Sequence, residues 1–224
     1  DNKHVNVLIV GAGLSGIGAA YHIEKECSDK KYLILESRDQ LGGTWDLFRY
    51  PGIRSDSDMC TMGFRFKPWK GEKLVAEGGL ILDYLHEIAD ENSIKEKIQY
   101  HSHVNSVSWS SEEARWTISY KNKLDNSINT MSCDFLYFCV GYYDYKKGYE
   151  PDFKGRDSFK GQIIHPQKWP HDLDYSGKRV VVIGSGATAV TLIPSMAEKT
   201  EHITMLQRSP TYYMIRPNSN PLGD

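Results

Sequence analysis

The chain of 224 residues exceeds the roughly 100–200 residues of a typical domain, which allows one large domain or one complete and one partial domain. Its 27 Lys and Arg against 29 Asp and Glu give a formal net charge of −2, so nucleic acid is not an expected partner. The longest apolar runs, such as residues 135–140, fall far short of the roughly 20 residues that span a bilayer, so no membrane segment is expected.

The start of the chain and its cysteines add further expectations. The opening DNKHVNVLIV lacks a basic stretch followed by a small-residue cleavage site, so a cytoplasmic location is expected. The four cysteines, Cys27, Cys60, Cys133 and Cys139, include no C-x-x-C, which argues against a redox dithiol and a zinc site. We expect them to be small buried hydrophobic side chains, and we expect no bound metal.

The first elements form a βαβ unit. The apolar run at residues 5–10, interrupted only by Asn6, predicts a central parallel strand. Apolar residues at helical spacing predict a helix over 14–26, and a second strand is predicted at 32–36. Residues 37–72 carry Gly, Pro, Trp, Arg and Asp without a period, which predicts a long irregular segment of the kind that is usually functional.

A second group of elements follows this segment. Ile81, Leu85 and Ile88 predict a helix, and residues 98–109, 115–120 and 132–140 predict strands of a meander that returns to the first sheet. The turn residues at 123–126 predict a hairpin between the last two strands.

The last part of the chain repeats the opening pattern. Residues 142–178 are rich in Tyr, Gly, Pro, Lys and Asp, which is typical of a connection between domains. A strand over 179–183, a helix to about residue 199 and a strand over 202–207 follow. One βα pair and one further strand cannot cover a parallel sheet on both faces, so residues 179–224 are expected to be an incomplete domain.

The first glycine-rich loop predicts a dinucleotide site. Gly11, Gly13 and Gly16 form G-x-G-x-x-G between a strand and a helix, where they allow a tight turn, close approach of a pyrophosphate and close helix packing. Glu36 ends the second strand, where a carboxylate can accept hydrogen bonds from the ribose hydroxyls of an adenosine. A purely structural glycine turn is the alternative.

The second loop has the same form and a different ending. Gly184, Gly186 and Ala189 follow a strand, but the next strand ends in Arg208 with a hydroxyl beside it at Ser209. A guanidinium suits the 2′-phosphate of NADP, which a carboxylate would repel. The alternative is that Arg208 is a solvated surface charge.

Two different nucleotides are therefore expected in one chain. The simplest pair is FAD, held permanently at the first loop, and NADPH, which visits the second loop to deliver a hydride. That pair predicts an oxidoreductase.

Two further motifs carry a family resemblance. They are G-x-W-x-x-x-x-[FY]-P-G-x-x-x-D, formed by Gly43, Trp45, Tyr50, Pro51, Gly52 and Asp56, and F-x-G-x-x-x-H-x-x-x-W-P, formed by Phe159, Gly161, His165, Trp169 and Pro170. With the two loops, they make the whole chain resemble the type I Baeyer–Villiger monooxygenases. The runs GGTWDLFRYPGIRSDSDM and IIHPQKWPHDLDY are most similar to the branch with the mycobacterial monooxygenase that activates thioamide prodrugs.

The resemblance implies a role for many residues. The FAD site would comprise Gly11, Gly13, Ser15, Gly16 and Glu36, with Gly43, Thr44, Trp45 and Asp46 along the flavin and Val104 near the adenine. Asp56 matches the family's active-site Asp, close to the flavin and the nicotinamide. NADP would contact Arg54, Ser55, Asp56, Ile183, Gly184, Ser185, Gly186, Ala187, Thr188, Ala189, Gln207 and Arg208. His165 would belong to the linker and couple its motions.

The resemblance also implies a fold and a reaction. The fold would be α/β, with two Rossmann-like dinucleotide-binding domains: an FAD domain over residues 1–145, a linker over 146–178, and an NADP domain over 179–224 that is incomplete. NADPH would reduce FAD, O₂ would be captured as a flavin C4a-peroxide, and one oxygen would enter beside a ketone carbonyl or onto the soft sulfur of a sulfide or thioamide. The family's catalytic Arg would lie beyond Asp224, in a natural protein about twice this length.

Other functions stay open at this point. A flavin-containing N- or S-monooxygenase or an N-hydroxylase would carry the same two loops, although Trp169-Pro170 favours the Baeyer–Villiger type. A disulfide reductase is excluded by the missing C-x-x-C. A non-catalytic flavin- and NADP-binding redox sensor is the alternative from another class.

Overall fold

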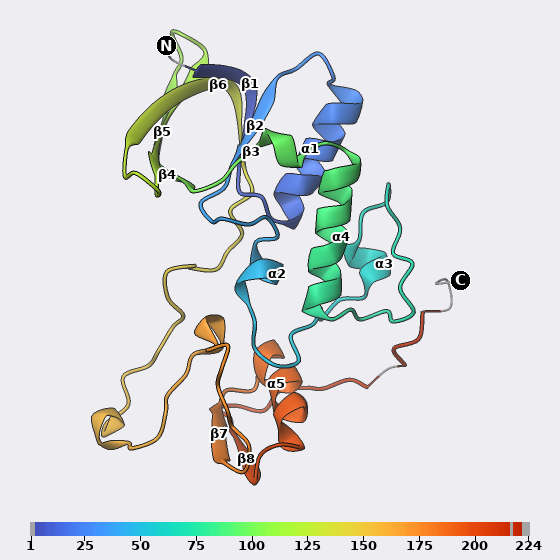
Figure 1. Ribbon diagram of the computed structural model, residues 1–224, viewed down its shortest axis with the longest axis vertical. Helices are drawn as coiled ribbons and strands as arrows, with labels where there is room; N and C mark the ends of the chain where they lie inside the picture. The colour runs from blue at the N-terminus through green and yellow to red at the C-terminus, as the bar shows by residue number, and fades with distance from the viewer. Residues whose placement is uncertain (1–2, 216, 221–224) are drawn as a thin grey trace. The chain divides into compact units, whose positions relative to one another are not determined.

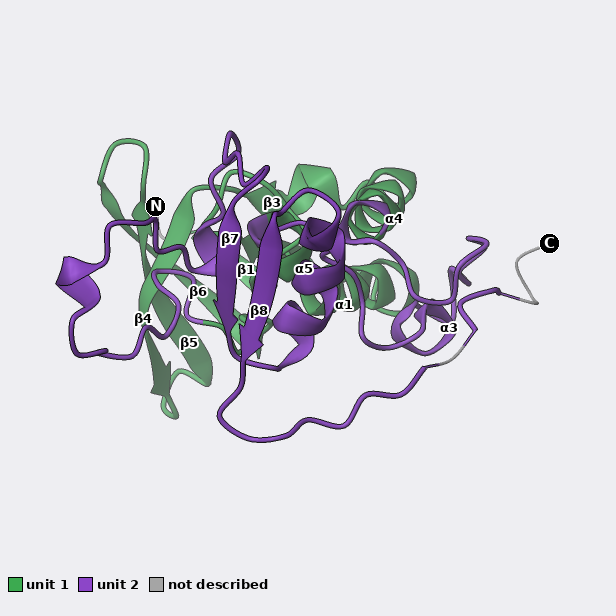
Figure 2. Cartoon of the chain, turned by 90° about the horizontal axis from the view of Figure 1, so that it is seen from below, with its two compact units in different colours: residues 1–46, 81–143 green, residues 47–80, 144–224 purple. Residues whose placement is uncertain are grey.

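The computed structural model describes residues 3–215 and 217–220. The chain forms two compact units, coloured separately in Figure 2. Unit 1 comprises Asp1–Asp46 and Ile81–Tyr143, and unit 2 comprises Leu47–Leu80 and Asp144–Asp224. No helix within the described ranges is both long enough and apolar enough to cross a membrane.

Unit 1 is built on a six-stranded sheet with the order β3-β2-β1-β6-β5-β4. Its strands are β1 (Lys3–Val10), β2 (Tyr32–Leu35), β3 (Ile98–Gln99), β4 (Ser102–Ser110), β5 (Arg115–Asn122) and β6 (Ile128–Phe138). Strand β1 pairs in parallel with both β2 and β6, whereas β4, β5 and β6 pair antiparallel. Strand β1 lies inside the sheet between β2 and β6, and its Leu8 and Ile9 are fully buried. This parallel arrangement confirms a Rossmann-like fold.

Two long helices accompany the parallel strands (Figure 1). Helix α1 (Leu14–Glu26) connects β1 to β2 and buries Ile17 and Ala20, as its spacing predicts. Helix α4 (Gly78–Glu91) buries Ile81, Leu85 and Ile88, one turn apart on one face. Both helices were predicted, although α4 starts earlier and ends later than its apolar positions indicate.

Three sequence-based expectations for residues 27–139 need correction. The strand expected over 98–109 is broken into β3 and β4, because His101 adopts a φ of 55° in the turn between them. The irregular segment contains two single-turn helices, α2 (Thr44–Leu47) and α3 (Met59–Met62). The expectation of four buried cysteines is wrong, because Cys27 and Cys60 are exposed.

Unit 2 contains the second strand–helix–strand pattern. Strands β7 (Arg179–Ile183) and β8 (His202–Leu206) pair in parallel and are joined by α5 (Ala187–Ala197). One face of this sheet packs on the helix, whereas Val181, Ile183 and Leu206 on the other face are between 56% and 61% exposed. Within the described part of the chain, the two strands are therefore covered on one face only, as the sequence predicts.

The core of unit 2 includes residues far from α5 in sequence. Phe48 and Tyr50 form a buried cluster with Leu192 and Met196 of α5, and Trp169 packs against this cluster. The connecting residues fold into short 3₁₀ helices at Arg156–Ser158 and Pro166–Lys168, and another precedes β3 at Lys95–Lys97. The segment just after α2 is thus part of the unit that carries the second glycine loop.

Candidate dinucleotide-binding sites

The first glycine loop is a turn in which side chains are sterically excluded. Gly11 has a φ of 104°, and a Cβ on it would lie 2.4 Å from the carbonyl oxygen of Cys139 on the neighbouring strand connection. A Cβ on Gly16 would lie 2.0 Å from the carbonyl oxygen of Gly11. Backbone therefore packs on backbone, as the G-x-G-x-x-G pattern requires.

The N-terminus of α1 is left without a side-chain cap. Gly13 is the N-cap residue and makes no side-chain hydrogen bond, whereas α3 is capped by Asp58, which accepts a hydrogen bond from the Thr61 amide at 2.9 Å. Uncapped N–H groups at a helix start are the donors that a pyrophosphate uses. Ser15 stands exposed in the first turn of this helix.

Glu36 lies directly beside the glycine loop. Its carboxylate is only 6% exposed, and its Oε2 accepts a hydrogen bond from the Ala12 amide at 2.7 Å. Its Oε1 accepts another from the Arg38 amide at 2.9 Å. Each carboxylate oxygen has a second lone pair, so the group can still accept from ribose hydroxyls.

The Gly-Gly turn after β2 returns the chain to the same place. Gly42 and Gly43 have φ values of 117° and 55°, and the Gly42 amide donates to the Ala12 carbonyl at 2.9 Å. A Cβ on Gly13 would lie 3.6 Å from the Cα of Gly43. The first loop, Glu36 and the start of α2 thus converge within unit 1.

Sequence reasoning missed Arg38, which completes this cluster. Its guanidinium forms an ion pair with Asp46, whose side chain is 7% exposed. Thr44 and Trp45, the other residues of α2 predicted at the flavin, are partly buried. The signal that could have identified Arg38 is the placement of an Arg and an Asp on either side of a Gly-Gly turn, which allows the two to meet.

Val104 occupies a different part of unit 1. It lies on β4 next to a register shift between Val104 and Ser106. Its side chain packs against the core cluster that contains Leu35, the residue before Glu36. The residue expected near the adenine thus packs on the core cluster that also contains Leu35, the last residue of β2.

The second glycine loop lies in unit 2 at the start of α5. Gly184 has a φ of 123° and donates its amide to the Leu206 carbonyl at 2.8 Å, and Gly186 caps α5 without a side-chain hydrogen bond. Ala189 is buried, whereas Ala187 is exposed and Thr188 is half-buried. Gln207 and Arg208, which follow β8 directly, are exposed.

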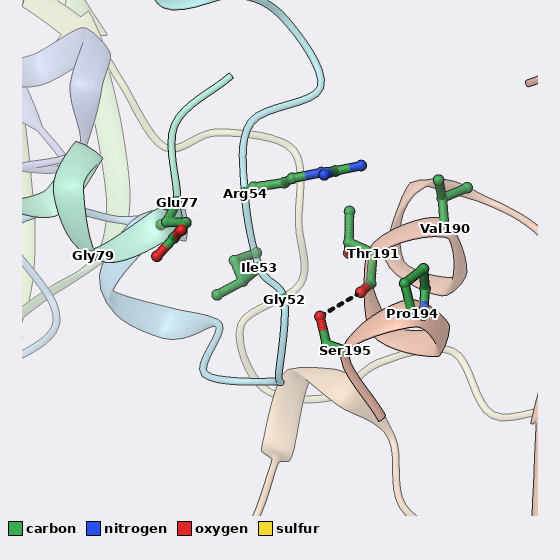
Figure 3. A pocket seen from close by; sticks show the side chains of 10 residues that line it. Gly52, Ile53, Arg54, Glu77, Gly79, Val190, Thr191, Pro194 and Ser195 are labelled. Carbon is green, nitrogen blue, oxygen red and sulfur yellow. Dashed lines mark hydrogen bonds between the residues drawn. The ribbon is translucent and has the colours of Figure 1, made fainter. Parts of the chain in front are cut away.

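The Pro-Gly turn of the irregular segment packs on α5. Gly52 has a φ of 79°, and a Cβ on it would lie 2.3 Å from the Thr191 carbonyl oxygen and 2.1 Å from the Ser195 Oγ. Only glycine fits there, which explains the P-G of the motif. Next to this contact is a cavity of about 470 Å³ in unit 2 (Figure 3). It is lined by Gly52, Ile53, Arg54, Glu77, Gly78, Gly79, Val190, Thr191, Pro194 and Ser195.

The predicted NADP contacts at 54–56 face different surroundings. Arg54 is exposed and its side chain extends along the cavity towards α5 (Figure 3). Ser55 is 1% exposed, and its hydroxyl accepts a hydrogen bond from the Ala76 amide at 3.2 Å. Asp56 follows it and is exposed. Ser55 thus anchors the backbone between two accessible charged residues.

The linker histidine packs tightly on the linker itself. The His165 ring sits where a Cβ on Gly148 would lie 2.0 Å from its Cε1, and its Nδ1 accepts from the Gln167 amide at 3.2 Å. Gln167, also missed from sequence, is 7% exposed and donates to the Asp144 carbonyl at 2.7 Å. These contacts hold residues 165–167, in the middle of the linker, against its start.

Comparison with protein families places both loops in a known context. A model described as flavin-binding monooxygenase-like matches residues 54–221, and a model of an NAD(P)-binding Rossmann-like domain matches residues 9–67.

Curated relatives match almost the whole chain. The FAD-containing monooxygenase EthA of Mycobacterium tuberculosis is 51% identical over 99% of this chain and 45% of its own length. The putative FAD-containing monooxygenase MymA of the same species is 54% identical over 100% of this chain and 46% of its own. The probable FAD-binding monooxygenase AlmA of an Acinetobacter species is 52% identical over 96% and 44%. The chain thus spans less than half the length of these relatives.

Solved structures of similar fold include monooxygenases. A steroid monooxygenase bound to NADP superposes with a TM-score of 0.81 at 31% identity, over 94% of this chain and 40% of that one. An open structure of cyclohexanone monooxygenase gives a TM-score of 0.85 at 26% identity, over 98% and 43%. OTEMO, in complex with FAD and NADP, gives 0.76 at 30% identity, over 94% and 40%.

Proposed function

Because the chain belongs to the flavin-binding monooxygenase-like family, we propose that it forms the FAD- and NADPH-binding part of a monooxygenase. One observation carries the proposal. Two glycine loops of the same form are each followed by a helix and a second strand, and the residues after these strands differ: the buried carboxylate of Glu36 follows the first, and the exposed guanidinium of Arg208 follows the second. The acid suits free ribose hydroxyls, and the base suits a 2′-phosphate.

The proposed FAD site is the cluster in unit 1. The uncapped start of α1 would face the pyrophosphate, Glu36 would accept from the ribose, and α2 would line the flavin. Backbone packing at Gly11 and Gly16 fixes the shape of the loop that would receive the phosphate. These features fit FAD, which would supply the redox chemistry that the side chains lack. Ser15 and Val104 complete the proposed contacts.

The proposed NADP site is the loop at the start of α5. The residues assigned to it are Arg54, Ser55, Asp56, Ile183, Gly184, Ser185, Gly186, Ala187, Thr188, Ala189, Gln207 and Arg208. The free helix start fits a pyrophosphate, and the exposed Arg208 fits a phosphate that arrives from solvent. We propose the FAD domain to span 1–145, the linker 146–178 and the NADP domain 179–224.

The proposed reaction is insertion of one oxygen atom from O₂ into a ketone or onto the sulfur of a sulfide or thioamide. Support for the Baeyer–Villiger type comes from the linker motif, in which Trp169 packs on the unit 2 core and His165 on Gly148. Cyclohexanone and steroid monooxygenases among the similar structures support ketones. Asp56, exposed beside the anchored Ser55, is proposed to act at the nicotinamide and the flavin. We also propose a cytoplasmic location, where free thiols such as those of this chain persist.

Spectroscopy and product analysis of the complete protein that contains this chain test the function. We expect a bound flavin whose visible colour bleaches on anaerobic addition of NADPH and returns in air. With isotopically labelled O₂ and a small ketone or sulfide, one labelled oxygen should appear in the product. Binding without turnover would support a redox sensor instead, and turnover of amines alone would support an N-hydroxylase.

Arg208→Ala tests the assignment of the second nucleotide. A charge-assisted hydrogen bond is worth about 1.5–3 kcal/mol, so KM for NADPH should rise roughly ten- to hundredfold, while KM for NADH changes little. Arg179→Ala, at the opposite end of β7, is the matched control and should leave both values unchanged. An unchanged preference for NADPH in Arg208→Ala contradicts the assignment.

A further inference from the structure

The second glycine loop is held by the segment that follows β8. The Ser185 hydroxyl lies 2.7 Å from the Thr211 hydroxyl, within hydrogen-bond distance. The Ser185 carbonyl accepts a hydrogen bond from the Tyr213 hydroxyl at 3.3 Å, and that hydroxyl also lies 3.6 Å from the Met205 sulfur on β8. Thr211 and Tyr213 therefore contact the middle residue of G-S-G at both its side chain and its backbone.

The first loop is held in a different way. A Cβ on Gly11 or Gly16 would meet backbone oxygen at 2.4 or 2.0 Å, so packed backbone fixes that loop. A Cβ on Gly184 or Gly186 meets no described atom within 4 Å. The second loop is open on these sides, and side-chain hydroxyls from residues 211 and 213 take the place of the packed backbone.

Holding this loop matters for binding a pyrophosphate. The N–H groups at an uncapped helix start bind an anion well only when their directions are fixed beforehand, because ordering a loop on binding costs conformational entropy. Gly186 provides such a start to α5. The segment that carries Thr211 and Tyr213 begins directly after Arg208. One short stretch of chain therefore both carries the guanidinium and contacts the loop.

We propose that Thr211 and Tyr213 are positioning residues for the nicotinamide nucleotide: they fix Ser185 so that the loop receives the pyrophosphate. The inference rests on the proposed role of this loop in binding NADP. A pyrophosphate is common to NADPH and NADH, whereas the 2′-phosphate is not. Loss of either hydroxyl therefore weakens the binding of NADPH and of NADH by the same factor, whereas loss of Arg208 weakens mainly the binding of NADPH.

The test uses the complete protein with its FAD. We would measure KM and kcat for NADPH and NADH, and Kd for NADP⁺ by calorimetry, in Tyr213→Phe, Thr211→Val and Thr211→Ser. Each lost hydrogen bond should raise KM and Kd roughly two- to tenfold for both nucleotides, with kcat, FAD content and melting temperature unchanged. Thr211→Ser keeps the hydroxyl and should behave as the unmodified protein.

Tyr212→Phe is the matched control, because it removes the same hydroxyl from a neighbouring side chain that is fully exposed. It should leave all values unchanged. The proposal is overturned if KM and Kd are unaffected in both Tyr213→Phe and Thr211→Val, if the ratio between NADPH and NADH changes, or if FAD content and melting temperature fall together with affinity.

Failure of the proposed function gives a different result. If the unmodified protein binds NADP⁺ without oxidising NADPH, the monooxygenase is contradicted while Kd still tests the hydroxyl contacts. If it binds neither nucleotide, the assignment of the loop fails and this inference fails with it.

Discussion

Glu36 and Arg38 show how one buried acid serves two purposes at the residue scale. The Glu36 carboxylate accepts two backbone hydrogen bonds, from Ala12 and Arg38, and so joins the glycine loop to the segment after β2. The Arg38 guanidinium then pairs with Asp46 of α2. A charged group that is removed from water needs such partners, since an unpaired buried charge is costly. The proposed flavin site is thus organised by the protein itself.

Gly16→Ala should abolish FAD binding at this site. Its Cβ would lie 2.0 Å from the Gly11 carbonyl oxygen, so the helix start must move away from the loop that would hold the pyrophosphate. Flavin content of the purified complete protein measures the effect, and we expect a largely colourless product.

Gly79→Ala provides the matched control for this substitution. Gly79 lies in the first turn of α4, and a Cβ on it meets nothing within 4 Å. Alanine is the better helix former by about 1 kcal/mol, so this variant should keep its FAD and be no less stable. Full flavin content in Gly16→Ala would contradict the steric explanation.

Single residues differ in how well sequence predicts them. Gly11, Gly16 and Gly52 are predictable because their neighbours are set by motifs, and the structure gives each a close backbone contact. Arg38 was missed, because the positive φ angles of the Gly-Gly turn bring its partner Asp46 back to it and no periodic pattern records such a turn. Thr211 was missed for a similar reason, since its contact with Ser185 depends on the path of the irregular segment after β8.

At the scale of elements, periodic segments were predicted and short ones were not. Helices α1 and α4 have enough turns for an apolar stripe, so their spacing predicted them. Helices α2 and α3 have one turn each and carry no period that sequence could reveal. The break between β3 and β4 depends on a left-handed His101, which no apolar pattern records.

Helix α4 should make stability sensitive to mild acid through His86. Burial is the main cause that lowers the pKa of His86 below its ordinary 6.5, and the positive charge of the nearby Lys95 lowers it further. The negative charges of Asp90, Asp46 and Asp83 oppose this shift without cancelling it. The unfolded chain therefore takes up the proton more readily. The contribution of His86 to the free energy of unfolding is therefore present above a pH of about 6.5. It is lost as the pH falls through the lowered pKa of His86 in the folded protein.

His86→Gln tests this expectation, because glutamine keeps polarity and size without titrating. The melting temperature of the unmodified protein should fall between about pH 7.5 and about pH 5.5, and the fall should be smaller in His86→Gln. The exposed carboxylates with lowered pKa, such as Asp134 and Asp174, titrate in more acidic solution and contribute little in this range. Equal falls in both proteins would show that His86 is not responsible.

At the scale of the whole molecule, the tryptophan–Pro-Gly motif is divided between the two units. Gly43 and Trp45 belong to unit 1, whereas Tyr50 and Gly52 belong to unit 2 and contact α5 there or its cluster. A sequence motif that reads as part of the first nucleotide site is therefore also a structural part of the second unit. Sequence alone gives no sign of this, because Phe48 and α5 are more than a hundred residues apart.

Phe48→Ala tests the division of the motif. Truncating a buried Phe lowers the free energy of unfolding by roughly 3–5 kcal/mol, and we expect unit 2 to be destabilised by this amount. In hydrogen exchange, amides of α5 should lose protection while those of α1 keep it. Ile17→Ala, in the core of α1, is the reciprocal control and should give the opposite pattern. Loss of protection in α1 alone after Phe48→Ala would contradict the assignment of this segment.

The exposed thiols offer a practical benefit. Cys27 lies in unit 1 and Cys60 in unit 2, both open to solvent, while burial raises the pKa of Cys133 to about 11 and also raises that of Cys139. Maleimide dyes react with thiolates, so at neutral pH they should attach first to the two exposed sites. A donor and an acceptor fluorophore placed on these two cysteines, without an engineered cysteine in this part of the protein, would report whether the distance between the two units changes when nucleotides bind and leave.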